Sequence, residues 1–136
     1  MLASVNTLVL NGIEASTVRV EADIMSGLPH FEIVGLASAA VKEARERVRS
    51  ALRNSGYDFP NRRITVNLAP ADVKKEGSHF DLPIALGILL ASGQLDELEG
   101  LDEYHLAGEL SLDGSLRPVP GILPMALHLA DVGQAS

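Results

Sequence analysis

The dipeptide Asn11-Gly12 constrains the fold of this chain most, because it separates two runs rich in Val, Ile, Leu and Thr. Asn-Gly is the strongest short signal for a type I′ turn, whose two central residues both require positive φ. The flanking runs cover residues 2–10 and 14–24, and apolar and polar residues alternate from Val18 to Ile24. We therefore expect the chain to open with an antiparallel β-hairpin.

The spacing of apolar residues changes from a strand period to a helix period after residue 37. From Ser38 to about Asn54 they recur on one helix face, and Gly56 ends the pattern. The other expected elements are strands at residues 30–36, 63–70 and 104–110, a turn at Asp113-Gly114 into a further strand, and helices at residues 82–92 and 122–131. The order β-β-β-α-β-α-β-β-α predicts an α/β fold in which helices cover a mixed β-sheet.

Length and composition limit the classes of protein that fit. A chain of 136 residues with 46% hydrophobic residues supports one compact domain. It has no cysteine, so it can form neither disulfides nor thiolate metal sites, and its four histidines lack the spacing of metal ligands. Neither G-x-x-x-x-G-K-[ST] nor G-x-G-x-x-G occurs, so we expect no cofactor and no metal in this chain.

Targeting signals are missing from the sequence as well. No run of eighteen apolar residues occurs, and the first residues lack a basic leader. We therefore expect a cytoplasmic protein without membrane contact, with Met1 as its natural start and further chain after residue 136.

Charge is distributed unevenly along the chain. The net charge is −7, yet nine of the eleven Lys and Arg residues lie between Lys42 and Lys75, where only four acidic residues oppose them. The candidate nucleic-acid-binding residues are Lys42, Arg45, Arg49, Arg53, Arg62, Arg63, Lys74 and Lys75. The first four follow helical spacing and would form a stripe able to neutralise phosphates. A solvated helix face with Glu43 and Glu46 paired to neighbouring arginines, or a contact with an acidic partner domain, explains the same pattern.

The segment from residue 74 to residue 89 contains Ser78, a weak candidate for a nucleophile. A serine nucleophile needs a base, but Lys74 and Lys75 are expected in a charged loop where nothing apolar lowers their pKa. Pro83 fits the first turn of a helix, which allows an N-cap at Phe80 or Asp81, and the carboxylate of Asp81 makes it the expected cap. On the residues alone, Ser78 is interpreted as part of a loop.

Five blocks of the sequence resemble one family. They are GLPHFEIVGL at 27–36, VKEARERVRSAL at 41–52, RITVNLAPAD at 63–72, KEGSHFDLPIA at 75–85 and GELSLDGSLRPV at 108–119. This pattern closely resembles the N-terminal domain of the bacterial Mg-chelatase-like AAA+ ATPases, the family of the ComM and YifB proteins. The blocks span nearly the whole chain.

The resemblance implies a fold like that of Lon-type protease domains, within a superfold shared with a small-subunit ribosomal protein. It also implies that residues 1–136 are the N-terminal domain of a longer protein whose AAA+ motor, absent from this chain, binds ATP and Mg²⁺ and forms a hexamer. The expected partners are DNA and the protein's own AAA+ domain. The expected activity of the full-length protein is that of an ATP-dependent helicase in branch migration, during natural transformation or recombination.

The same resemblance places the Lon catalytic dyad on residues that cannot perform its chemistry. The position of the catalytic serine falls on His79 and that of the catalytic lysine on Leu123. A noncatalytic domain is therefore expected. The alternatives are a divergent Ser-Lys peptidase that uses Ser78, or a protein like a magnesium chelatase subunit.

Overall fold

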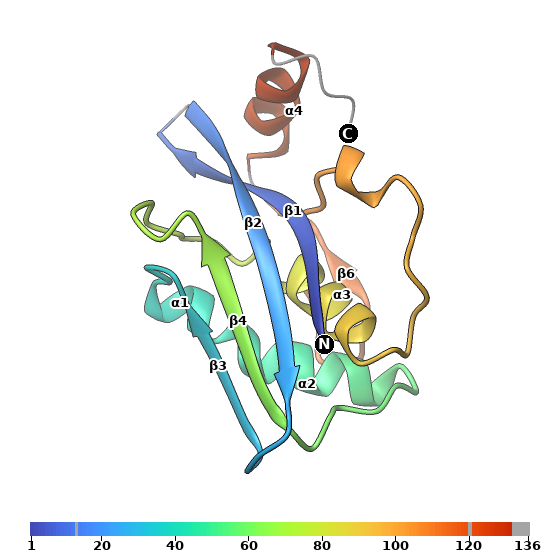
Figure 1. The fold of residues 1–136 in the computed structure, drawn as a ribbon. Helices are drawn as coiled ribbons and strands as arrows, with labels where there is room; N and C mark the ends of the chain where they lie inside the picture. The colour runs from blue at the N-terminus through green and yellow to red at the C-terminus, as the bar shows by residue number, and fades with distance from the viewer. Residues whose placement is uncertain (13, 120, 132–136) are drawn as a thin grey trace.

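The computed structural model describes residues 1–12, 14–119 and 121–131 as an α/β arrangement (Figure 1). The strands are β1 (Leu2–Asn11), β2 (Glu14–Met25), β3 (His30–Val34), β4 (Arg63–Ala69), β5 (Glu109–Leu110) and β6 (Leu116–Arg117). The helices are α1 (Ala39–Lys42), α2 (Ala44–Asn54), α3 (Asp81–Ala91), the 3-10 helix η1 (Leu101–Glu103) and α4 (Ile122–Asp131). The expected element order is confirmed, although a short break divides the first helix.

The main sheet is mixed, with strand order β1-β2-β4-β3. β1 pairs with β2, and β2 with β4, in antiparallel fashion, whereas β3 and β4 run parallel. Parallel neighbours require a crossover, which α1 and α2 provide. The hairpin between β1 and β2 is confirmed in these strands, and Gly12 has the expected positive φ of 67°. The expected positive φ at Asn11 is wrong, because Asn11 still pairs with Glu14 as the last residue of β1. Residue 13 lies outside the described residues.

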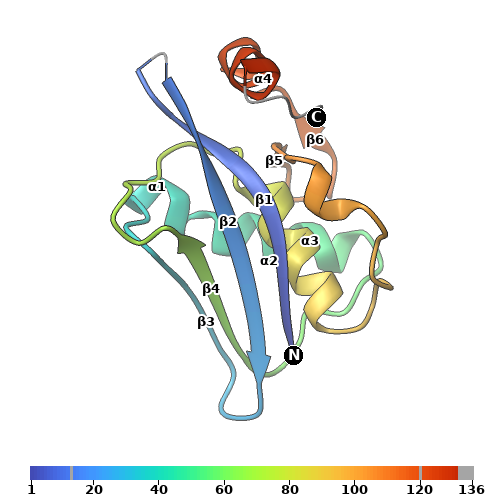
Figure 2. The ribbon, with the colours of Figure 1, turned by 45° about the horizontal axis from the view of Figure 1, so that its top comes forward.

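The core lies between the sheet and the pair α2 and α3, which cover one face of it (Figure 1). Alternate residues of β2 and β4, among them Val20 and Val66, point toward these helices and are fully buried. α3 is apolar on nearly all sides and is buried along most of its length, as expected for a helix inside a core. α4 packs beside the hairpin end of β1 and β2, where Leu8 contacts Met125 and Leu129 (Figure 2).

Two expected elements differ in the structure. The helix expected from Ser38 to Asn54 is divided at Glu43, because the amide of Glu46 bonds to the carbonyl of Glu43 and tightens the turn. The strand expected at residues 104–110 is wrong over most of its length, since only Glu109–Leu110 pairs as a strand. His105 forms a single bridge to Asn6 instead. No helix among the described residues is long and apolar enough to cross a membrane.

Candidate functional site

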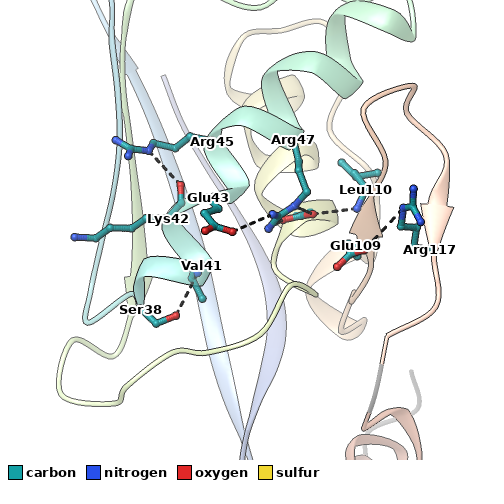
Figure 3. Close-up of polar contacts among 10 residues, drawn as sticks. Ser38, Val41, Lys42, Glu43, Arg45, Arg47, Glu109, Leu110 and Arg117 are labelled. Atoms are coloured by element: carbon teal, nitrogen blue, oxygen red, sulfur yellow. Dashed lines mark hydrogen bonds and ion pairs between the residues drawn. The ribbon is translucent and has the colours of Figure 1, made fainter.

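The first residue of α3 is tied to α2 by an ion pair between Arg47 and the buried Asp81. Arg47 donates from Nε to Oδ2 of Asp81 at 2.7 Å and from Nη2 to Oδ1 at 3.1 Å. The backbone amide of Leu110 donates a third hydrogen bond to Oδ2 at 3.0 Å. Figure 3 shows the Arg47 guanidinium between Glu43 and Leu110, and the carboxylate that accepts from both Arg47 and Leu110 joins α2, α3 and β5.

The expectation that Asp81 caps α3 is therefore wrong. The N-cap position is held by Phe80, which makes no capping hydrogen bond with its side chain, and Asp81 is the first helical residue. Its carboxylate is fully buried and bonds to Arg47 and Leu110 rather than to amides of its own helix. Burial raises the pKa of Asp81, while the hydrogen bonds from Arg47 and Leu110 oppose that rise.

Arg47 was missed among the candidate residues of the sequence. The signal was present, because Arg47 lies three residues after Ala44 and four before Ala51, on the helix side that carries the core residues. An arginine at the border of an apolar face is a candidate for a buried partner, and a carboxylate at a helix start is its natural acceptor.

Lys75 is also buried, which corrects two expectations. Its Nζ donates to the backbone carbonyl of Gly35 at 2.6 Å and to that of Pro70. Burial lowers the pKa of Lys75, contrary to the prediction that nothing apolar would do so. Because its ammonium is enclosed and bonded to the backbone, Lys75 cannot contact DNA in this arrangement.

His79 and Leu123 are the two positions to which the resemblance assigned a protease dyad, and they lie in different environments. His79 is buried, its Nε2 lies 2.5 Å from the carbonyl oxygen of Leu8, and its ring packs on Phe80. Burial lowers the pKa of His79, so a neutral ring that donates to Leu8 fits the site. Leu123 is 69% exposed on α4.

Ser78 lies half-buried in a bend before α3. Among the described residues its hydroxyl makes no hydrogen bond to a lysine. Lys75 is held by Gly35 and Pro70, and Lys74 pairs with Glu76 at 3.0 Å. The geometry therefore offers no base for a Ser-Lys peptidase at this position.

The first half of the basic stripe extends outward from α1 and α2. Lys42 and Arg45 point to the same side, away from Arg47, and Nε of Arg45 donates to the carbonyl of Lys42 at 3.2 Å (Figure 3). Both residues are exposed. The expected pairs of Glu43 with Arg47 and of Glu46 with Arg49 are present, at 3.9 Å and 3.1 Å.

The second half of the stripe is organised around one aromatic ring. The guanidinium groups of Arg49 and Arg53 lie over the ring of Phe59, at 5.2 Å and 5.8 Å from its centroid. Phe59 itself packs against Phe31 of β3, with ring centroids 5.5 Å apart. These contacts place this end of the stripe beside β3, the edge strand of the sheet.

The other candidate basic residues are distributed around the domain. Arg62 is exposed in the loop after Phe59, near the Arg53 end of the stripe. Arg63 is exposed on β4 and points to the sheet face opposite α2 and α3, because its neighbour Ile64 points into the core. Lys74 is exposed in the segment that pairs with residue 37, at the other end of the stripe.

The basic residues that α1 and α2 carry outside the Arg47–Asp81 pair are together called the basic face. It consists of Lys42, Arg45, Arg49 and Arg53. In the described part of the chain, no group of three or more His, Asp or Glu side chains could hold a metal ion.

Comparison with known proteins gives this α/β domain a family. A family model described as subunit ChlI of Mg-chelatase matches residues 20–136. The chain is 50% identical to the protein YifB of Escherichia coli over 98% of this chain and 26% of that protein. It is also 50% identical to the competence protein ComM of Haemophilus influenzae, over 93% of this chain and 25% of ComM. The chain thus belongs to the Mg-chelatase-like family of the ComM and YifB proteins, and it spans about a quarter of the length of these relatives.

Proposed function

We propose that this domain is the noncatalytic N-terminal domain of a Mg-chelatase-like AAA+ ATPase and that its basic face helps the longer protein to bind DNA. In this proposal the remaining chain supplies an AAA+ motor that binds ATP and Mg²⁺ and assembles as a hexamer in the cytoplasm. The motor acts as a helicase in branch migration during natural transformation or recombination. The domain itself has a fold like that of Lon-type protease domains, with which its order of strands and helices is compatible.

The observation that carries the proposal is the geometry of the basic face. Arg45 and Arg53 are eight residues apart on α2, so this part of the stripe is roughly 12 Å long at the rise of an α-helix, and Lys42 lies on α1 beyond the break at Glu43. A strand of B-DNA carries one phosphate per about 3.4 Å of axis, so a stripe of this length runs alongside about four phosphates. Phe59 and Glu46 restrict the side chains of Arg49 and Arg53, which reduces the conformational entropy lost on binding.

The similarity to ComM also supports a role in DNA binding. The name of ComM assigns it to competence, and the chain is 50% identical to ComM over nearly its whole length. A domain with net charge −7 would repel DNA from most of its surface, so any contact must be confined to a positive region. Among the described residues, the basic face is the positive surface that combines alignment with restricted side chains.

A salt series with the full-length protein tests the proposal. Binding of fluorescent single-stranded and forked DNA, in the presence of ATP, should weaken steeply as salt increases. The double variant Arg45→Glu with Arg49→Glu should weaken binding and flatten the salt dependence. The matched control is Arg19→Glu with Arg117→Glu, which makes the same charge change at exposed arginines outside the basic face.

The control separates a local contact from the effect of net charge. If both double variants lose the same affinity, the effect is one of overall charge and the basic face is not the contact. Binding that is unchanged in Arg45→Glu with Arg49→Glu also contradicts the assignment. Urea unfolding of each variant verifies that its fold is retained.

A further inference from the structure

The outer edge of β1 is covered along only part of its length. The carbonyl of Asn6 accepts a hydrogen bond from the amide of Leu106 at 2.9 Å, and the carbonyl of Leu8 lies 2.5 Å from Nε2 of His79. These contacts cover the half of β1 that leads into the hairpin. Toward the start of β1 they stop.

In an antiparallel pair, successive residues direct their backbone groups alternately toward and away from the partner strand. This alternation shows which backbone groups are unpaired at the start of β1. Met1 and Ile24 exchange two backbone hydrogen bonds, at 2.7 Å and 3.1 Å. Every second residue from Met1 therefore bonds to β2, and Leu2 and Ser4 direct their N–H and C=O groups away from it. Among the described residues, these four backbone groups have no hydrogen-bonding partner.

A groove of about 920 Å³ lies against this open edge. One side is formed by residues 1–4, and the other by the segment from Leu95 to Asp102, which leaves the end of α3 and returns beside β1 (Figure 1). Leu90, Leu95 and Leu101 supply apolar lining. An added strand lies about 4.8 Å from its neighbour, so a groove beside an open edge is the place where one fits.

The charged residues along the groove indicate that its occupant carries positive charge. Four acidic side chains line it, and Arg19 is the single Lys or Arg among its lining residues. The four acidic residues are Asp96, Glu97, Glu99 and Asp102. None of them forms an ion pair within the described part of the chain. Their carboxylates are available to a positively charged partner.

We propose that this groove binds an extended segment of a partner protein, in which basic and apolar side chains alternate, as an added strand on β1. The backbone of the segment pairs with Leu2 and Ser4. Its apolar side chains contact Leu90 and Leu95, and its basic side chains reach the carboxylates of the rim. Because β1 and β3 are opposite edges of the sheet, the groove and the basic face can be occupied together.

A peptide with alternating valine and lysine tests the proposal on the full-length protein. Fluorescence anisotropy should show binding by this peptide, weaker binding by its N-methylated form, and none by a valine-glutamate peptide. N-methylation removes the N–H donors and leaves the charge in place, so it separates strand pairing from charge attraction. Equal binding of the methylated peptide overturns the proposal.

A pair of charge variants tests the location. Asp96→Lys with Glu97→Lys should weaken binding of the valine-lysine peptide about tenfold, since two exposed ion pairs become repulsive contacts. The control Glu14→Lys with Asp58→Lys makes the same charge change at exposed acidic residues away from the groove and should leave the affinity unchanged. Equal losses in both variants contradict the location.

Hydrogen exchange measures the strand pairing directly, without any variant. At saturating valine-lysine peptide, the amides of Leu2 and Ser4 should become protected, and exchange that stays fast overturns the proposal. Protection that increases with protein concentration in the absence of peptide assigns the groove to a second copy of the chain, which also overturns it.

Discussion

Replacing Arg47 by alanine is the most direct test of the tie between α2, α3 and β5. The change removes the guanidinium that donates to both carboxylate oxygens of Asp81, at 2.7 Å and 3.1 Å. The amide of Leu110 is then the remaining donor, at 3.0 Å. Since the Asp81 side chain is fully buried, its negative charge is left without a positively charged partner.

The expected loss follows from this burial. Removing one partner of a buried ion pair costs about 3–5 kcal/mol of unfolding free energy. The Arg47 side chain is 23% exposed, so water can enter part of the vacated space and the cost should fall near the lower limit. A loss of about 3 kcal/mol is a large share of the roughly 5–15 kcal/mol that stabilises a typical domain.

Urea unfolding at neutral and acidic pH provides the assay. Burial raises the pKa of Asp81 above its ordinary value of 3.8, and loss of Arg47 raises it further. The folded variant therefore binds a proton at a higher pH than its unfolded chain does, and lowering the pH through this window favours the folded state. The deficit of Arg47→Ala relative to the native chain should be largest near neutral pH and should shrink as the pH falls toward about 4.

Two comparisons isolate the ion pair. Arg45→Ala, an exposed arginine two residues away, should change the unfolding free energy by no more than about 0.5 kcal/mol. Arg47→Met with Asp81→Leu replaces the pair by apolar side chains and should recover most of the loss. A deficit below about 1 kcal/mol for Arg47→Ala, or one that is independent of pH, would refute the reasoning.

Two further predictions concern the loop that holds Lys75. Lys75→Met leaves the carbonyls of Gly35 and Pro70 without a donor and should cost about 2 kcal/mol near neutral pH in urea unfolding. Burial lowers the pKa of Lys75 below 10.5, so the folded chain binds fewer protons than the unfolded chain as the pH approaches 10.5 from below. Native stability should therefore rise with pH in that range, and a rise of equal size in Lys75→Met would contradict this cause. Gly35→Ala should cost on the order of 3 kcal/mol in thermal unfolding, because Gly35 has φ of 105° and an added Cβ would lie 2.2 Å from the carbonyl oxygen of Leu68. In the control Gly93→Ala, Gly93 has φ of 78° and an added Cβ would have no atom within 4 Å, so the unfolding free energy should fall by only about 1 kcal/mol. Equal losses in the two variants would show that the positive φ, and not the contact with Leu68, causes the cost.

Local patterns were sufficient to predict most of the fold. The Asn-Gly turn, the alternation from Val18 to Ile24 and the helical spacing after Ser38 correspond to β1, β2, α1 and α2 in the structure. These signals are local, because the backbone period fixes which side chains share a face. The strand expected at residues 104–108 is wrong because a strand also needs a partner edge elsewhere in the chain, which local alternation cannot show.

The candidate site divides in the same way. Helical spacing alone predicted one line for Lys42, Arg45, Arg49 and Arg53. The structure places Lys42 on α1 and the three arginines on α2, and it adds the Phe59 ring that holds Arg49 and Arg53. The sequence could not place Lys75, because a lysine in a charged stretch looks exposed until the carbonyls of Gly35 and Pro70 are brought to its Nζ.

The sequence by itself determined the order of elements, the amphipathic α2 and the family. Only the tertiary structure decided that Asp81 pairs with Arg47 instead of capping α3, and that the edge of β1 is open at Leu2 and Ser4. The reason is physical. Periodicity and capping are properties of neighbouring residues, whereas burial of a charge and completion of a sheet edge depend on segments that meet only in the folded chain.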